Sequence, residues 1–273
     1  MLSCLGVDVG RADVVEVHAV VRDETATVTS APRMQRDFIM AKTPRPWIVT
    51  RHDAVEKLEE NLWAVAGDVP GVPVQRRMSI VKLSNGELLF FNAIPLEDAL
   101  LEEVRSWGRP SMLVVPHHQH MIDAHAFREK LGLKLYGPAE CAEAIGARAE
   151  LTGALDAIKT DGDVTVQPLP GVKLGEPAIV VRSPSGRVSV LFGDAIQNTR
   201  KETLNLPFRL MGFGGGPKVV PVFKMMFVKD KPRLKERLTE LSELEGLARV
   251  VPSHGEIVAS AAGVALKSAA SAA

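Results

Sequence analysis

Four of the seven histidines of this 273-residue chain lie within nine residues, directly after an apolar run with the composition of a buried β-strand. The run is 111–115, and the histidines are His117, His118, His120 and His125. A strand that ends in closely spaced imidazoles presents nitrogen donors at one edge of a sheet, as in the zinc or iron sites of hydrolases. The pattern therefore predicts a metal site, present or ancestral, at a strand end. The alternative is a polar loop in which histidines cap the following helix.

The composition is that of an ordinary globular protein. With 46% hydrophobic and 24% charged residues, a chain of this length can form one sizeable α/β domain or two small ones. Lysine plus arginine equals aspartate plus glutamate at 33 each, so no overall field attracts a nucleic acid or an anionic membrane. We therefore expect neither of these partners.

Cysteine usage and hydropathy bear on the compartment. The two cysteines, Cys4 and Cys141, lie far apart in the sequence, which argues against a disulfide framework and fits a reducing environment. No apolar stretch reaches the roughly 18 residues that span a bilayer, and the N-terminus lacks the pattern of a signal peptide. These features predict a cytoplasmic protein.

The first 40 residues differ from the rest. Residues 1–39 show no sustained period of 2 or 3.6, whereas the proline-marked segment 41–47 resembles the start of a domain. We predict that 1–39 are a loosely attached extension of a single domain at 40–273. The alternatives are an added edge strand or an arm that binds a partner.

From residue 61 onward, strand and helix patterns succeed one another regularly. Strands are predicted at 61–66, 78–83, 88–92, 111–115, 134–136, 164–169, 178–182, 187–192 and 248–251. Helices are predicted at 96–107, 124–131, 139–149 and 232–245, with a last helix after 259. The first half of the chain has strands followed by helices, and the second half repeats this order. This arrangement predicts an α/β protein built as a four-layer αββα sandwich.

Two further motifs follow apolar strands. Gly193-Asp194 comes directly after a run that ends in Leu191-Phe192, and Ser253-His254-Gly255 follows 250–252. Because ligands gather at strand ends in α/β proteins, we expect the histidine loop, Asp194 and His254 to converge at one sheet edge.

In order and spacing, the three motifs resemble those of the metallo-β-lactamase superfamily over about residues 61–258. The histidine loop stands where that family has His-x-His-x-Asp-His, Gly193-Asp194 matches a metal-bridging aspartate, and His254 matches the final histidine ligand. The resemblance implies the αββα fold and a one- or two-metal site. The implied metal ligands are His118, His120, Asp123, His125, Asp194 and His254.

The chain also departs from the family pattern. Val172 stands where the resemblance implies another histidine, and an isopropyl group cannot bind a metal. Asp123 lies one residue late relative to His118 and His120, and if the register starts at His117 instead, Gln119 replaces a ligand. We therefore expect at most one metal per chain, bound in a mixed nitrogen and oxygen site that accepts zinc, iron or manganese.

Two functions are consistent with these residues. The first is a metal-dependent hydrolase of a small ester, thioester, lactone or phosphoester, in which a metal-activated water attacks the substrate. Asp194 would then bind the metal and orient the water, and His125 or Asp123 would accept a proton. The alternative is a degenerate, metal-free member that binds a small ligand or a partner. A serine hydrolase is disfavoured because there is no Gly-x-Ser-x-Gly elbow.

Residues 197–230 resemble the variable insert that this superfamily carries between its last two motifs. Within it, the glycine-rich segment 212–217 lacks the ending of a phosphate loop and predicts a flexible lid or crossing loop. The apolar segment 219–228 predicts core or the wall of a substrate pocket. We expect a small-molecule ligand or substrate, and the sequence does not indicate an oligomeric state.

Overall fold

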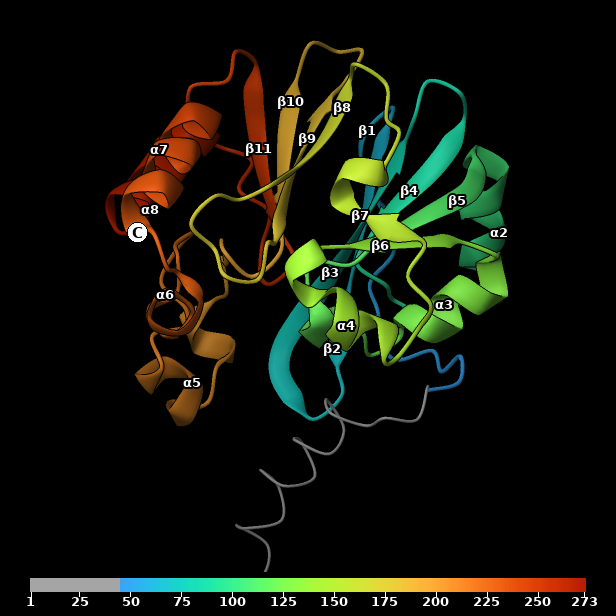
Figure 1. Cartoon of the computed structure of the whole chain (residues 1–273), viewed down its shortest axis with the longest axis horizontal. Coiled ribbons are helices and arrows are strands. Elements are labelled where there is room, and N and C mark those ends of the chain that lie inside the picture. The colour runs from blue at the N-terminus through green and yellow to red at the C-terminus, as the bar shows by residue number, and fades with distance from the viewer. Residues whose placement is uncertain (1–44) are drawn as a thin grey trace, which may run out of the picture.

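Two β-sheets pack face to face between helices in the computed structural model, which describes residues 45–273. In Figure 1, helices α7 (Lys231–Ser242) and α8 (Ala262–Ser271) lie outside one sheet, and α2 (Asp98–Trp107) and α3 (Ala124–Leu131) lie outside the other. The αββα sandwich predicted from the sequence is thus confirmed. The predicted extension at 1–39 lies outside the described residues.

The larger sheet has seven strands in sequential order, β1 to β7. Strands β1 to β4 form an antiparallel meander, and β4 to β7 run parallel with helical connections between them. The strands are β1 (Glu56–Glu59), β2 (Leu62–Val69), β3 (Val72–Lys82), β4 (Glu87–Phe91), β5 (Arg109–Val114), β6 (Lys134–Gly137) and β7 (Gly153–Ala154). The short helix α4 (Ala142–Gly146) lies between the last two.

The smaller sheet has four strands in the order β11-β10-β9-β8. They are β8 (Val164–Pro168), β9 (Pro177–Arg182), β10 (Val188–Phe192) and β11 (Leu247–Pro252). The pair β10 and β11 is parallel, with Phe192 opposite Pro252. The residues that follow these two strands, Asp194 and His254, are therefore delivered to the same edge.

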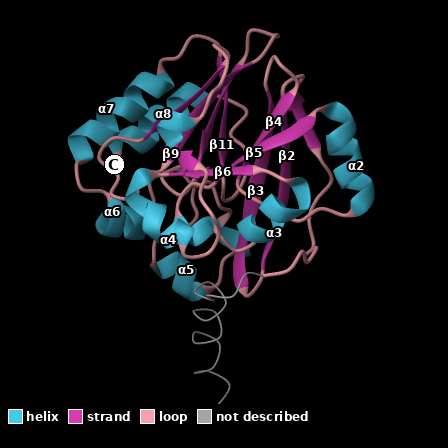
Figure 2. Cartoon of the chain, turned by 45° about the vertical axis from the view of Figure 1, so that its right-hand side comes forward, coloured by secondary structure: helices cyan, strands magenta, loops and turns pink. Residues whose placement is uncertain are grey.

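The inner faces of the two sheets meet in one apolar cluster, and helices cover the outer faces (Figure 2). Leu89 and Val114 of the larger sheet pack with Leu191 and Val251 of the smaller one, all at most 1% exposed. Strands covered on both faces read as continuous apolar runs, which is why β4, β5 and β10 are recognisable in the sequence.

The main differences from the predicted elements lie in β3, α4 and the insert. Strand β3 begins at Val72, six residues before the predicted strand, because its first half carries polar side chains that face cavities. Helix α4 covers only Ala142–Gly146 of the predicted 139–149. The segment 219–228 contains the helix α6 (Pro221–Phe227). It is only partly core, because Met225 is 77% exposed.

A second short helix, α5 (Leu206–Leu210), precedes the glycine-rich segment. Among the described residues, no helix has both the length and the apolar character needed to cross a membrane.

Candidate metal centre

Three strand ends bring four side chains of the candidate site together. His117 and His120 follow β5, Asp194 follows β10, and His254 follows β11. The Asp194 carboxylate is the common partner: Oδ2 lies 3.0 Å from His117 Nε2, while Oδ1 lies 3.3 Å from His120 Nε2 and 3.2 Å from His254 Nε2. The predicted convergence of the histidine loop, Asp194 and His254 is therefore observed.

A single turn of 3-10 helix decides which histidines face Asp194. It spans His118–His120, with His117 as its N-cap. Residues three apart lie above one another in a 3-10 helix, so His117 and His120 share a side. In an extended chain, His118 and His120 would share it instead.

His120 and His254 are held by hydrogen bonds at their outer ring nitrogens. His254 Nδ1 lies 2.9 Å from the carbonyl oxygen of Gln75, and His120 Nδ1 lies 3.3 Å from Asn92 Oδ1. Both oxygens are acceptors; Asn92 Nδ2 donates to the Arg77 carbonyl, which fixes the orientation of that amide. The Nδ1 atoms therefore carry hydrogen, and in the neutral rings the Nε2 lone pairs face Asp194.

His117 has the opposite tautomer. Its Nδ1 accepts a hydrogen bond of 3.3 Å from the backbone N–H of Gln119. Its Nε2 therefore carries the hydrogen and donates to Asp194 Oδ2. In this arrangement His117 orients the carboxylate, and it could bind a metal only by giving up the bond to Gln119.

Glu176 lies behind the cluster and is fully buried. Its Oε1 accepts a hydrogen bond from the Ala195 N–H, whereas Oε2 lies 3.9 Å from His117 Nε2 and has no hydrogen-bond partner within residues 45–273. Burial, with the nearby Asp194 charge, raises the pKa of Glu176 to about 7, although His117 opposes this shift. A protonated Glu176 leaves Asp194 as the anion of the site.

The histidines and Asp194 shift one another's pKa. Burial lowers the pKa of His120 to about 4, against the opposing effect of Asp194. Burial also acts to lower the pKa of His254, but its hydrogen bond to Asp194 and the carboxylate charge raise it overall. Burial acts to raise the pKa of Asp194, yet the three imidazoles hold it well below its usual value. Asp194 is therefore ionised, and His120 is neutral, at neutral pH.

The donor set fits a divalent cation. His117, His120 and Asp194 form a group whose donor atoms all lie within 4.8 Å of one another, close enough for one ion. Two ligands of a tetrahedral zinc ion, each bound at 2.0–2.1 Å, are about 3.3 Å apart. The distance from Asp194 Oδ1 to His120 Nε2, 3.3 Å, matches that separation. His254 Nε2 lies 3.2 Å from the same oxygen but is not part of the group of three.

A cavity of about 220 Å³ opens onto this cluster. His120, Asp194 and His254 line it. Its other lining residues are polar or aliphatic: Arg76, Asn92, Gln119, Val69, Val72, Val74 and Ile122. A small molecule in this cavity would lie against both the donor atoms and an apolar surface.

Comparison with solved structures identifies the architecture. The chain is similar to DIM-1 metallo-β-lactamase in a crystal structure of that enzyme exposed to ceftazidime, with a TM-score of 0.57 and 16% identity over 82% of this chain and 99% of that one. It is also similar to a metallo-β-lactamase from Pontibacter korlensis, with a TM-score of 0.54 and 13% identity over 81% and 99% of the two chains. The chain has the metallo-β-lactamase fold.

No family model and no curated protein sequence matches the chain. Its residues must therefore be assessed one by one within the metallo-β-lactamase fold.

Asp123 does not join the cluster around Asp194. Its fully buried carboxylate pairs with the Arg76 guanidinium through Oδ2, and its Oδ1 lies 3.4 Å from Arg45 Nη1. A buried carboxylate needs such partners. Arg76 thus provides the positive charge that Asp123 requires, a role that the sequence did not suggest.

His118 and His125 also lie apart from the Asp194 carboxylate contacts. His118 Nδ1 is 3.4 Å from the buried Cys141 thiol, on the other side of the 3-10 turn. His125 lies on α3 and lines a separate cavity with Trp47. Neither ring contacts Asp194, because the 3-10 turn directs His118 toward Cys141 and α3 places His125 at the separate cavity.

Val172 packs in the apolar core and is 2% exposed. Its backbone pairs with Val228, beside the insert. The loop before β9 therefore contributes core packing at the position where the family resemblance implies a histidine. Glu176, four residues later, is the buried polar residue of this loop, and nothing in the local sequence distinguishes it from a surface glutamate.

Proposed function

We propose that the chain is a single-metal hydrolase of a small ester, thioester, lactone or phosphoester. The observation that supports this most directly is that Nε2 of His120 and Nε2 of His254 lie 3.3 and 3.2 Å from one carboxylate oxygen of Asp194, while Nδ1 of each ring faces an acceptor. Lone pairs and a carboxylate oxygen repel one another unless a proton or a metal ion lies between them. His120 and Asp194 would hold the ion, with His117 or His254 as the third ligand.

The residues present divide the remaining tasks. A bound divalent ion would supply a Lewis acid and lower the pKa of a water toward neutrality. Three protein ligands leave a fourth position open for that water, as catalytic zinc sites require. His117 keeps the Asp194 carboxylate in place through Oδ2. Nitrogen and oxygen donors together suit zinc, iron or manganese.

Neither Asp123 nor His125 has a part in this proposal. Asp123 is paired with Arg76, and His125 lines another cavity. Asp194, which lines the site cavity, is the carboxylate that can orient the water.

One observation favours the metal-free, ligand-binding alternative. The Asp194 carboxylate already has three imidazole partners within 3.3 Å. Its charge raises the pKa of His254, so a protonated His254 can donate to it. In that case the cluster would be a closed polar network.

Metal-dependent activity distinguishes the two functions. Chelator-treated protein would be titrated with zinc, manganese and iron while hydrolysis of aryl acetate, thioester, lactone and aryl phosphodiester substrates is followed. We expect metal to restore activity toward one class, and His120→Gln to reduce it at least about 100-fold because a ligand is lost.

His125→Gln is the matched control, since it removes a histidine of the same loop that lies outside the cluster; we expect near-normal activity. Metal-independent hydrolysis, or equal loss in the two variants, would refute the proposal. No hydrolysis and no thermal stabilisation by any metal would support the ligand-binding alternative.

A further inference from the structure

The wall of the site cavity contains one arginine, Arg76, on β3. Its side chain is 4% exposed and lies beside His254, whose backbone forms a β-bridge with that of Arg76. Nη2 donates to Asp123, whereas Nε is buried without a hydrogen-bond partner among the described residues. A guanidinium carries five N–H donors. Asp123 accepts from Nη2, so an acceptor in the cavity would complement the other N–H groups that border it.

Within the part of the chain that the structure describes, no other side chain of the cavity wall is hydrogen-bonded to Arg76, although the amides of Asn92 and Gln119 also line the cavity. The cavity is lined around Arg76 by the aliphatic side chains Val72, Val74 and Ile122. Asp194 is the one carboxylate among its lining residues, and three imidazoles surround it. Arg76 is therefore a buried guanidinium that is paired with Asp123 through Nη2, and an oxyanion in the cavity would complement its other N–H groups.

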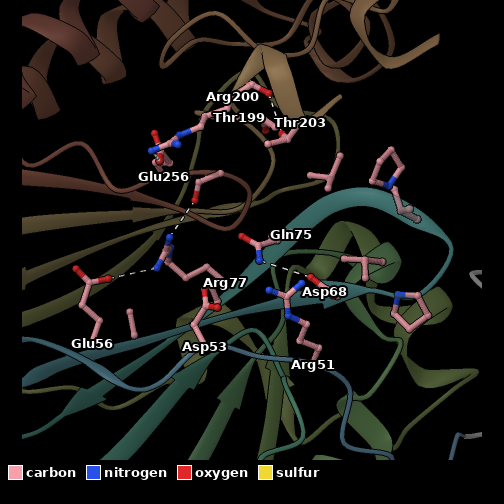
Figure 3. A pocket seen from close by; sticks show the side chains of 18 of the residues that line it. Arg51, Asp53, Glu56, Asp68, Gln75, Arg77, Thr199, Arg200, Thr203 and Glu256 are labelled. Atoms are coloured by element: carbon pink, nitrogen blue, oxygen red, sulfur yellow. Dashed lines mark hydrogen bonds and ion pairs between the residues drawn. The ribbon is translucent and has the colours of Figure 1, made fainter. Parts of the chain in front are cut away.

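On the opposite face of β3, Arg77 has two partners within the chain, although its Nε, like that of Arg76, is buried without a partner in the described part of the chain. Side chains alternate along a strand, so Val74 and Arg76 line the site cavity while Gln75 and Arg77 line a larger cavity of about 820 Å³. Figure 3 shows Arg77 directed toward Glu56, with a dashed line between them. Its Nη2 also donates to the carbonyl oxygen of Gly255 at 3.0 Å.

In the same cavity Arg200 pairs with Glu256 at 2.5 Å, and Gln75 bonds to Asp68. These pairs hold several of the charged and polar side chains of the larger cavity within the chain.

We propose that Arg76 binds an anionic group of the substrate, a carboxylate or a phosphate at one end of a short aliphatic molecule. This deepens the proposed hydrolase function, on which its catalytic meaning rests. At about 220 Å³ the cavity has room for roughly seven water molecules' worth of liquid. The anion would sit at Arg76, the aliphatic part against the valines, and the scissile group near Asp194.

The test measures anion binding separately from catalysis. Isothermal titration calorimetry at low salt would compare isobutyrate with its neutral isostere isobutyramide, using the full chain both chelator-treated and zinc-loaded. A second titration with inorganic phosphate shows whether the site prefers a phosphate or a carboxylate. We expect one anion to bind at least about tenfold more tightly than the amide, as charge-assisted hydrogen bonds imply.

Variants assign that preference to Arg76. The double variant Arg76→Leu/Asp123→Leu removes both charges of the buried pair and should abolish the preference. Arg76→Lys keeps a cation against Asp123 but has no Nε, and should lose most of it. Arg51→Leu, an exposed arginine of the larger cavity, should bind like the wild type.

Equal binding of both anions and the amide by the wild type would overturn the proposal, as would a preference that persists in Arg76→Lys and in the folded double variant. Because chelator-treated protein is used, the result stands apart from whether the cluster binds a metal. Asp194→Asn should lose metal binding yet retain the anion preference, so failure of one proposal is distinguishable from failure of the other.

Discussion

At the scale of single residues, the site depends on which ring nitrogen of each histidine carries hydrogen. In their neutral forms, His120 and His254 direct Nε2 lone pairs at Asp194, whereas His117 directs an N–H at it. The sequence indicated His120, Asp194 and His254 because each follows an apolar strand. It could not indicate whether His117 or His118 would join them, because a local 3-10 turn settles that choice.

The buried Glu176 should leave a pH-dependent signature in stability. Its folded-state pKa is raised to about 7, so as pH rises from about 4.5 the unfolded chain loses this proton first and the folded state is progressively destabilised. The effect is fully developed above the folded pKa. In chelator-treated protein, Glu176→Gln should therefore be more stable than wild type at pH 8, relative to pH 5, by on the order of 1–3 kcal/mol.

Urea unfolding at the two pH values measures this difference. The exposed Glu129 provides the control, and Glu129→Gln should follow the wild-type pH dependence. An unchanged pH dependence in Glu176→Gln would show that this carboxyl is not held protonated by burial.

At the scale of elements, the close approach of the end of β10 to the histidine loop positions the cluster. A Cβ on Gly193 would lie 2.7 Å from Pro116 Cβ and 2.8 Å from Glu176 Cδ, which is too close for carbon atoms in contact. The sequence predicted the strand, and the glycine explains why Asp194 can reach His117. The polar half of β3 was missed because Gln75 and Arg77 face a solvent-accessible cavity and not the core.

We predict that Gly193→Ala moves the two strand ends apart. Overpacking of this kind destabilises proteins by about 1–3 kcal/mol, and the displaced Asp194 should bind metal more weakly. Urea unfolding and zinc titration measure the two effects. Gly162→Ala, where an added Cβ meets no atom within 4 Å, is the control; equal behaviour of the two variants would contradict this account.

At the scale of the whole molecule, the αββα architecture was predictable because strands buried on both faces are apolar and each motif follows one of them. The roles of Arg76, as the partner of Asp123, and of Val172, as a core residue, were less predictable from the sequence. Both depend on contacts between segments far apart in sequence: Arg76 with Asp123, and Val172 with Val228. Together these two residues account for a site with fewer metal ligands than the family pattern implies.

The metal content of the protein tests the central claim most directly. Protein purified without chelators, and protein dialysed against buffered zinc, would be measured by elemental mass spectrometry. We predict about one equivalent per chain for wild type and His125→Gln, and near zero for Asp194→Asn and His254→Gln. Two tightly held equivalents in the wild type, or one equivalent that survives loss of Asp194, would contradict the account.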